Sequence, residues 1–227
     1  MCGRYVSPDE GSIEREFNLV RTEWRFPLSF NVAPTQEVPV IRVRAGRREG
    51  VRLRWGLIPF FSRGVAPKFS TINARMETIR TAASYRGPWD RGQRCLLAAC
   101  GFYEWQSQAD GRTRVPYYIH LNDQEIFGFA GLWDRSHTDQ GQTIESCVLI
   151  TVPANRLLAE IHNTQRRMPA ILAREDRDAW LRGGSPEAWS VLKPYPDEHM
   201  VAWPVSTRVN KPANNDAELI TPAARSL

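Results

Sequence analysis

The feature that most constrains the fold of this chain is an alternation of arginine with apolar residues between positions 38 and 55. Alternation with a period of two is typical of a β-strand that buries one face and exposes the other. The runs 38–44 and 51–55 flank a turn expected at 46–50, so together they predict an antiparallel hairpin. The exposed face of this hairpin is expected to be strongly basic.

Other segments predict further strands and several short helices. Apolar runs predict strands at 95–105, 116–121, 126–132 and 146–152. Helical patterns are found at 8–19, 154–161, 175–181 and 186–192. The first helix is expected to begin at a capping box formed by Ser7 and Glu10, with Ile13 and Phe17 on its buried face. This mixture predicts the α+β class in one domain, 1–227, with a loosely packed polar tail from about residue 212.

Composition limits the surroundings and partners of the chain. Its 227 residues carry a net charge of +5, the pI is near 9.3, and the cationic side chains are nearly all arginine. Arginine grips phosphate and stacks on bases, so nucleic acid is a reasonable partner, although a GC-rich genome produces the same bias. No segment has the length and apolar character of a membrane span or a signal peptide. We expect a cytoplasmic monomer that is associated with the nucleoid when it is bound to DNA.

The four cysteines are of two kinds. Cys95, Cys100 and Cys147 lie in apolar runs and are interpreted as small core residues. The spacing of the cysteines matches no zinc motif, and neither a metal nor a cofactor is expected. Cys2 follows a methionine, and a methionine before a small residue is usually removed, which would leave cysteine as the first residue.

An N-terminal cysteine pairs a free amine with a thiol. The ordinary pKa of an α-amine is about 8, against about 10.4 for lysine, so roughly a tenth of it is unprotonated at pH 7. The amine can attack an aldehyde to give a Schiff base, and the adjacent thiol can then close a five-membered thiazolidine ring. Taken alone, a cysteine at this position is more often an incidental residue in an unstructured terminus.

Polar residues in apolar surroundings are candidates for proton transfer or positioning. Glu104 in GFYEW lies among aromatics, which would raise its pKa, although a strand position facing water is an alternative. His162 follows a short helix and could shuttle protons near neutral pH, although a lone histidine is more often structural. Asn73 in INAR and Asn31 in FNVAPT could instead satisfy backbone groups.

Two adjacent aromatics, Phe60 and Phe61, precede a polar loop. Neighbouring side chains of an extended segment point to opposite faces, so one ring could be exposed and stack on a base or wedge beside one. Ordinary packing on two faces is the alternative.

Taken in order, a series of segments resembles the SRAP family, the SOS response-associated peptidases. The matching pieces are MCGRY, FNVAPTQ, RWGLIP, INARMET, CLLAACGFYEW, FGFAGLWD, LITVPAN, IHN with RRMPAIL, and WPVSTRVN. They extend from the N-terminus to about residue 210. The expected fold is α+β, a single strand-rich domain with an antiparallel, barrel-like sheet and short peripheral helices.

The resemblance implies a specific chemistry. Members of the family lose Met1 by their own peptidase action and use the exposed cysteine to cross-link abasic sites in single-stranded DNA. It implies that Cys2 is the nucleophile and that Asn73 positions the cysteine and the aldehyde. Glu104 would handle protons during ring formation, its reversal and removal of Met1, and His162 would help to open the sugar ring.

The resemblance also implies a DNA-contacting surface. Its expected residues are Arg4, Asn31, Pro34, Phe60, Phe61, Arg75, Trp105, Thr151 and Arg167. Many members have fewer residues between the histidine and the RMP-type arginine, so His162 reaches the site only if 163–166 bulge out as a loop. The choice between Arg166 and Arg167 as phosphate ligand stays open. So does the choice between the two phenylalanines as wedge, because the loop 60–71 is longer than in some members.

Two other functions are compatible with parts of the pattern. A non-covalent binder of single-stranded or modified DNA would need the basic hairpin and the aromatics only. A general cysteine peptidase fits poorly, because the nucleophile lies at the chain end. The joint presence of Cys2, Asn73, Glu104 and His162 favours the covalent function.

Overall fold

The computed structural model describes residues 2–19 and 24–223. The strands are β1 (Arg4–Ser7), β2 (Ser29–Val32), β3 (Glu37–Arg44), β4 (Arg47–Trp55), β5 (Asn73–Arg75), β6 (Arg94–Ala99), β7 (Gly101–Ser107), β8 (Arg114–Leu121), β9 (Phe127–His137), β10 (Thr143–Pro153), β11 (Arg167–Pro169), β12 (Ile171–Leu172) and β13 (Met200–Pro204). The α-helices are α1 (Glu10–Phe17), α2 (Ala83–Asp90), α3 (Arg156–Ile161), α4 (Arg177–Arg182) and α5 (Ser185–Ser190). Short 3-10 helices occupy Phe60–Ser62, Met76–Thr78, Arg174–Asp176, Asp197–His199, Thr207–Asn210 and Ala217–Ile220.

Strands β10, β4, β3, β6 and β9 close into a barrel, because β9 pairs with β10 again and completes the ring. Pairing around the ring is antiparallel except between β10 and β4, which are parallel. The strands approach closely at Gly131 of β9, where a Cβ would lie 2.8 Å from the carbonyl oxygen of Val148. The expected strand-rich α+β fold with a barrel-like sheet is confirmed.

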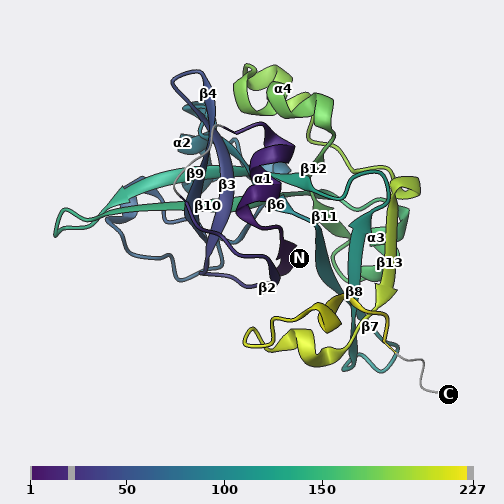
Figure 1. Ribbon diagram of the computed structural model, residues 1–227. Coiled ribbons are helices and arrows are strands. Elements are labelled where there is room, and N and C mark those ends of the chain that lie inside the picture. Colours follow the sequence, from purple (N-terminus) through teal and green to yellow (C-terminus); the bar gives the residue numbers. More distant parts are fainter. Residues whose placement is uncertain (1, 20–23, 224–227) are drawn as a thin grey trace.

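A second sheet lies beside the barrel, with the strand order β13-β8-β7-β1-β2 (Figure 1). Tyr5 of β1 and Phe102 of β7 meet Phe129 of the barrel edge-on, with ring centroids 5.9 and 5.8 Å apart. All three rings are fully buried. The two sheets therefore share one hydrophobic core, and Cys2 belongs to it.

Helix α1 forms where it was predicted but begins differently. Asp9 caps it, accepting a hydrogen bond of 3.0 Å from the Ser12 backbone N–H, so the predicted capping box is wrong. Ser7 is instead the buried last residue of β1, and Asp is as effective a cap as Ser. Ile13 and Phe17 are both buried, as predicted. None of the helices within the described ranges is long and apolar enough to cross a membrane.

The predicted strand 95–105 is two strands that belong to different sheets. β6 lies in the barrel and β7 in the second sheet, and the break falls at Cys100. Gly101 is required at the start of β7, because a Cβ there would lie 2.4 Å from the Tyr118 hydroxyl. Helix α2 was not predicted, because it has no side-chain cap and contains Pro88.

The hairpin of β3 and β4 is confirmed, with a tighter turn and a less basic face than predicted. Pairing continues to Arg44 and Arg47, so only Ala45 and Gly46, both with positive φ, form the turn. Three hairpin arginines form ion pairs: Arg42 with Glu49 and Glu145, Arg48 with Asp178, and Arg52 with Glu37. These carboxylates neutralise much of the face that was expected to be strongly basic.

The expected loose packing of the polar tail is wrong for the part of it that the structure describes. Leu219 is fully buried, and Val205 forms a β-bridge with Pro222. The Asn215 side chain accepts hydrogen bonds from the backbone N–H groups of Phe30 and Asn31. The end of the predicted tail, 224–227, lies outside the described residues.

Candidate functional site at the N-terminus

Cys2 is held against strand β5. Its side chain is 1% exposed, and Asn73 donates a hydrogen bond of 2.8 Å from Nδ2 to the carbonyl oxygen of Cys2. Strand β5 pairs in parallel with β10, which places Asn73 opposite Leu149 and Arg75 opposite Thr151. This pairing positions the INAR segment beside the N-terminal residues.

Glu104 approaches Cys2 from the second sheet. Strand β1 pairs with β7 with Arg4 opposite Tyr103, so the register brings the residues before Arg4 alongside Glu104. The Glu104 side chain is 2% exposed, so the alternative of a strand position facing water is wrong. Burial raises the pKa of Glu104 to about 7, and the backbone N–H of Trp105 opposes that rise. Burial also raises the pKa of the Cys2 thiol, and the Glu104 carboxylate raises it further, which places the two groups within electrostatic reach.

His162 forms the C-cap of α3, and its ring is buried. Its Nδ1 lies 2.8 Å from the carbonyl oxygen of Arg167, and burial lowers its pKa. Helix α3 is tied to the strand that carries Glu104, because Asn163 and Ser107 exchange two hydrogen bonds. The residues 163–166 form an exposed turn, which is the loop that His162 was expected to need in order to reach the site.

The three candidate phosphate-binding arginines differ in exposure. Arg75 is exposed and Arg4 is half-buried, with burial lowering its pKa. Arg167 is buried, whereas Arg166 lies in the exposed turn with a positive φ. The Arg167 guanidinium is occupied within the protein, donating to Glu77 at 2.6 Å and to the carbonyl oxygen of Thr151 at 2.5 Å. Arg75 therefore presents the most accessible of the three guanidinium groups.

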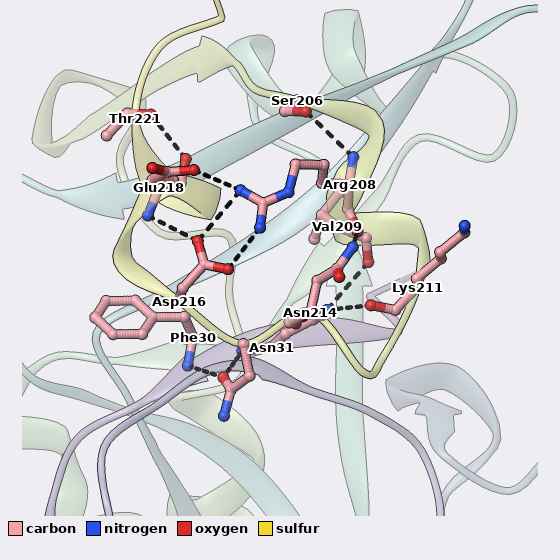
Figure 2. A network of polar contacts seen from close by, with 11 residues as sticks. Phe30, Asn31, Ser206, Arg208, Val209, Lys211, Asn214, Asp216, Glu218 and Thr221 are labelled. Carbon is pink, nitrogen blue, oxygen red and sulfur yellow. Dashed lines mark hydrogen bonds and ion pairs between the residues drawn. The ribbon is translucent and has the colours of Figure 1, made fainter.

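Asn31 has a scaffolding position. Its side chain is 2% exposed, and Nδ2 donates to three carbonyl oxygens of the C-terminal segment, those of Val209, Lys211 and Asn214, at 3.2, 3.1 and 2.8 Å (Figure 2). With all its amide hydrogens directed at this segment, Asn31 is not available as a donor to DNA. In the structure Asn31 holds the C-terminal segment in place, and its expected contact with DNA stays a prediction.

The same C-terminal segment reaches the site residues. Asn210 accepts a hydrogen bond of 2.9 Å from Trp105 Nε1, and its carbonyl oxygen lies 3.4 Å from Arg4 Nη2. Trp105 is half-buried, so part of its ring stays accessible beside Glu104. Pro34 is also half-buried and Thr151 is fully buried. Of these two residues, both expected on the DNA-contacting surface, Thr151 is positioned to act through Arg167, because its hydroxyl and carbonyl oxygens both accept from the guanidinium.

Phe60 and Phe61 are both exposed, at 54% and 52%, so ordinary packing on two faces is wrong. Their rings meet edge-on with centroids 5.5 Å apart. The buried carboxylate of Asp134 accepts the Phe60 backbone N–H at 2.9 Å, and Arg91 lies over the Phe60 ring, 5.0 Å from its centroid. Asp134 thus anchors Phe60 through its backbone, and Arg91 covers one face of the Phe60 ring.

Glu77, Asp134 and Asn210 were not predicted as parts of this region. They lie inside the quoted segments INARMET, FGFAGLWD and WPVSTRVN, but no pattern in the chain indicated which residue each one contacts. No group of three or more histidine, cysteine or acidic side chains arranged to hold a metal occurs among the residues that the structure describes. The site therefore combines a buried thiol, a carboxyl group that titrates near neutrality and a buried imidazole.

Comparison with known proteins gives consistent matches along most of the chain. The family model described as SOS response associated peptidase (SRAP) matches residues 1–212. The abasic site processing protein YoqW of Bacillus subtilis is 37% identical, with 97% of this chain and 99% of that protein covered. The abasic site processing protein HMCES of Rattus norvegicus is 31% identical over 93% of this chain and 70% of its own length.

Solved structures share the fold. A crystal structure from Bacteroides thetaiotaomicron has a TM-score of 0.89 at 29% identity, covering 99% of this chain and all of that one. One from Bordetella bronchiseptica has a TM-score of 0.79 at 28% identity, covering 90% of this chain and all of that one.

Proposed function

Because this chain belongs to the SOS response-associated peptidase family, we propose that it processes abasic sites in DNA through a covalent bond to Cys2. The observation that carries the proposal is the contact of Cys2 with Asn73, next to a buried Glu104 whose pKa is raised by burial to about 7. Removal of Met1 by hydrolysis of its peptide bond, through the protein's own peptidase activity, would free the α-amine of Cys2.

The reaction begins at the amine. The ring-opened deoxyribose of an abasic site carries an aldehyde, and the amine adds to its carbon to give a carbinolamine. Loss of one water forms the Schiff base. The Cys2 sulfur then bonds to the same carbon while the thiol proton is transferred to nitrogen, which closes the thiazolidine. The raised pKa of the buried thiol supports attack by the amine before attack by the thiol, since a protonated thiol is a poor first nucleophile.

Two groups with different proton affinities suit these steps. Glu104, with its pKa raised by burial, can accept a proton from the attacking amine and return one as water leaves. His162, with its pKa lowered by burial, is neutral near pH 7, and its proton affinity suits exchange with the sugar oxygen as the ring opens. Asn73 would fix the Cys2 backbone so that the amine meets the aldehyde in one orientation.

DNA recognition would combine phosphate contacts with stacking. Arg75 and Arg4 lie near the Cys2 site with at least partly accessible side chains, and Phe60 and Phe61 present exposed rings. Single-stranded DNA suits such a surface, because unpaired bases can stack on aromatic rings. A cross-link there would shield the lesion.

The test is incubation of the purified protein with single-stranded DNA containing one abasic site, followed by a denaturing gel and intact-mass measurement. We expect a heat-stable adduct with the mass of Met1-free protein plus DNA minus one water. A DNA with a tetrahydrofuran site, which has no aldehyde, is expected to give no adduct. Cys2→Ala is expected to lose the stable adduct and to retain DNA binding.

Cys100→Ala is the matched control, because Cys100 is a half-buried cysteine of the chain that lies outside the site. It is expected to cross-link like the wild type. A wild-type protein that binds the abasic DNA without forming an adduct would instead support the non-covalent binder, which the two exposed phenylalanines favour.

A further inference from the structure

One ion pair beside the site has no part in the function proposed above. Arg167 Nη1 donates to Glu77 Oε1 at 2.6 Å, and the side chains are 10% and 49% exposed. Glu77 follows β5, the strand that begins with Asn73, in the short 3-10 helix Met76–Thr78. One continuous segment thus contacts Cys2 at one end and Arg167 at the other. The hydrogen bond from Arg167 lowers the pKa of Glu77, so the carboxylate is ionised at neutral pH.

The guanidinium of Arg167 is held on two sides. Glu77 accepts from Nη1, while the carbonyl and hydroxyl oxygens of Thr151 accept from Nη2 at 2.5 and 3.3 Å. Thr151 lies on the central barrel strand β10 and is fully buried, so it is a rigid support. Glu77 is the half-exposed member of the arrangement, and it fixes the nitrogen that Thr151 does not reach.

The backbone of Arg167 connects the held guanidinium to His162. Its carbonyl oxygen lies 2.8 Å from His162 Nδ1. The Arg167 backbone N–H also lies 3.3 Å from Nδ1, and the two contacts need opposite tautomers. The carbonyl contact is the shorter of the two; because a carbonyl oxygen only accepts, it needs a proton on Nδ1, and a neutral ring then carries its lone pair on Nε2. The position of the Arg167 backbone therefore selects the tautomer and the orientation of His162.

We propose that Glu77 is a positioning residue for His162, acting through Arg167. The Glu77 carboxylate holds the guanidinium, the held side chain fixes the Arg167 backbone, and the carbonyl oxygen keeps the proton of His162 on Nδ1. Nε2 is then the ring nitrogen that would exchange a proton with the substrate. The inference deepens the proposed function, on which its kinetic part rests, while its effect on the histidine is independent of DNA.

A positioning role of Glu77 for His162 predicts different results from a role in which the Glu77 charge acts directly on DNA. A half-exposed carboxylate near phosphates repels them, so removing it should leave DNA binding unchanged or tighter. If Glu77 positions His162, its removal should nevertheless lower the cross-linking rate at saturating DNA. If the carboxylate acts only through its charge, Glu77→Gln and Glu77→Ala should behave alike. If it acts as a hydrogen-bond acceptor, Gln should preserve part of the function, because its amide oxygen can still accept.

The experiment compares Glu77→Ala and Glu77→Gln with Asp178→Ala, which removes an exposed carboxylate of helix α4 from its ion pairs with Arg48 and Arg182. The first readout is the titration and tautomer of His162 by NMR in DNA-free protein. We expect Glu77→Ala to lower the His162 pKa further and to shift its tautomer. Glu77→Gln should do so less, and Asp178→Ala should have no effect. An unchanged His162 in Glu77→Ala overturns the proposal.

The second readout is the single-turnover rate with saturating abasic single-stranded DNA. We expect a loss of about tenfold or more in Glu77→Ala, in the range of a misplaced general acid or base, and a smaller loss in Glu77→Gln. A wild-type rate in Glu77→Ala overturns the kinetic part. If wild-type protein forms no adduct while Glu77→Ala still changes His162, the proposed function fails and the positioning role stands.

Discussion

Asn73 donates a 2.8 Å hydrogen bond to the carbonyl oxygen of Cys2, although 71 positions separate them in the chain. The bond exists because β5 pairs in parallel with the central strand β10. The Asn73 side chain is almost fully buried, and its Oδ1 has no partner among the described residues. An acceptor left open in this way, next to the candidate nucleophile, is available to a substrate hydroxyl or to a freed amine.

Replacing Asn73 by alanine should impair both the site and the fold. It leaves the Cys2 carbonyl oxygen without this donor, which typically costs about 1–3 kcal/mol of unfolding free energy. The cross-linking rate should fall by about tenfold, because 1.4 kcal/mol of lost positioning corresponds to that factor. Urea unfolding and single-turnover kinetics measure the two effects. Asn122→Ala, which removes an exposed asparagine that donates to the Glu198 carbonyl oxygen, is the control and should change neither.

Glu104→Gln should change the pH dependence of stability. Burial raises the pKa of Glu104 from 4.5 to about 7, so the folded state holds this proton more tightly than the unfolded state. The unfolding free energy contributed by this group therefore falls as the pH rises from about 4.5 to about 7. The variant lacks that fall, so thermal unfolding from pH 4.5 to 8 should show a flatter profile than the wild type. Identical profiles would contradict the assigned pKa.

The same variant should slow cross-linking by about 10²–10⁴-fold and abolish the inflection of the rate near pH 7, because a general acid or base contributes about that factor. Single-turnover rates across pH measure this. Retention of both the rate and the inflection would remove Glu104 from the mechanism, whatever its effect on stability.

Much of the fold could be predicted from local pattern. The alternation in 38–55 gave the hairpin of β3 and β4, and Ile13 and Phe17 share the buried face of α1 as their spacing indicated. Local pattern failed where tertiary contacts decide the outcome. A continuous apolar run at 95–105 does not reveal that the chain changes sheets at Cys100, because both halves are equally suited to strands.

The residues of the candidate site could be predicted from motifs, but the contacts between them could not. INARMET contains both Asn73 and Glu77, yet only the parallel pairing with β10 shows that one reaches Cys2 and the other Arg167. The arginines of the hairpin were expected to form a strongly basic face. That expectation failed because Glu145 and Asp178 come from distant elements to pair with them, which the sequence does not show. The contacts of Asn31 with the C-terminal segment could not be predicted either, because its partners lie far along the chain.

The exposed aromatic pair should contribute to DNA affinity unequally. Arg91 covers one face of the Phe60 ring, so we expect Phe61 to be the ring that stacks or wedges. Phe61→Ala should weaken binding to single-stranded DNA by about 1–3 kcal/mol, and Phe60→Ala by less. Fluorescence anisotropy over a salt titration measures both. Val201→Ala, an exposed apolar position on β13, is the control, and a loss in Phe61→Ala no larger than in that control would contradict the assignment.

The C-terminal segment should be needed to place the residues that we propose contact DNA, although it lies far from them in sequence. Asn31 binds the segment through three carbonyl oxygens, and Asn210 at its turn contacts both Trp105 and Arg4 (Figure 2 shows the Asn31 contacts). Asn31→Ala removes the shared donor, which we expect to cost about 1–3 kcal/mol and to raise hydrogen exchange in 206–215.

Asn210→Ala should affect DNA binding more selectively. It removes only the acceptor of Trp105 Nε1–H, because its backbone carbonyl still faces Arg4. We expect Asn31→Ala to weaken binding to single-stranded DNA more than Asn210→Ala does. Loosening the segment frees both Trp105 and Arg4 from their contacts with Asn210, whereas Asn210→Ala frees Trp105 alone. Hydrogen exchange by mass spectrometry and anisotropy titrations measure the two properties in the same variants. If exchange in 206–215 rises in Asn31→Ala while its DNA affinity equals that of the wild type, the segment stabilises the fold without serving the site.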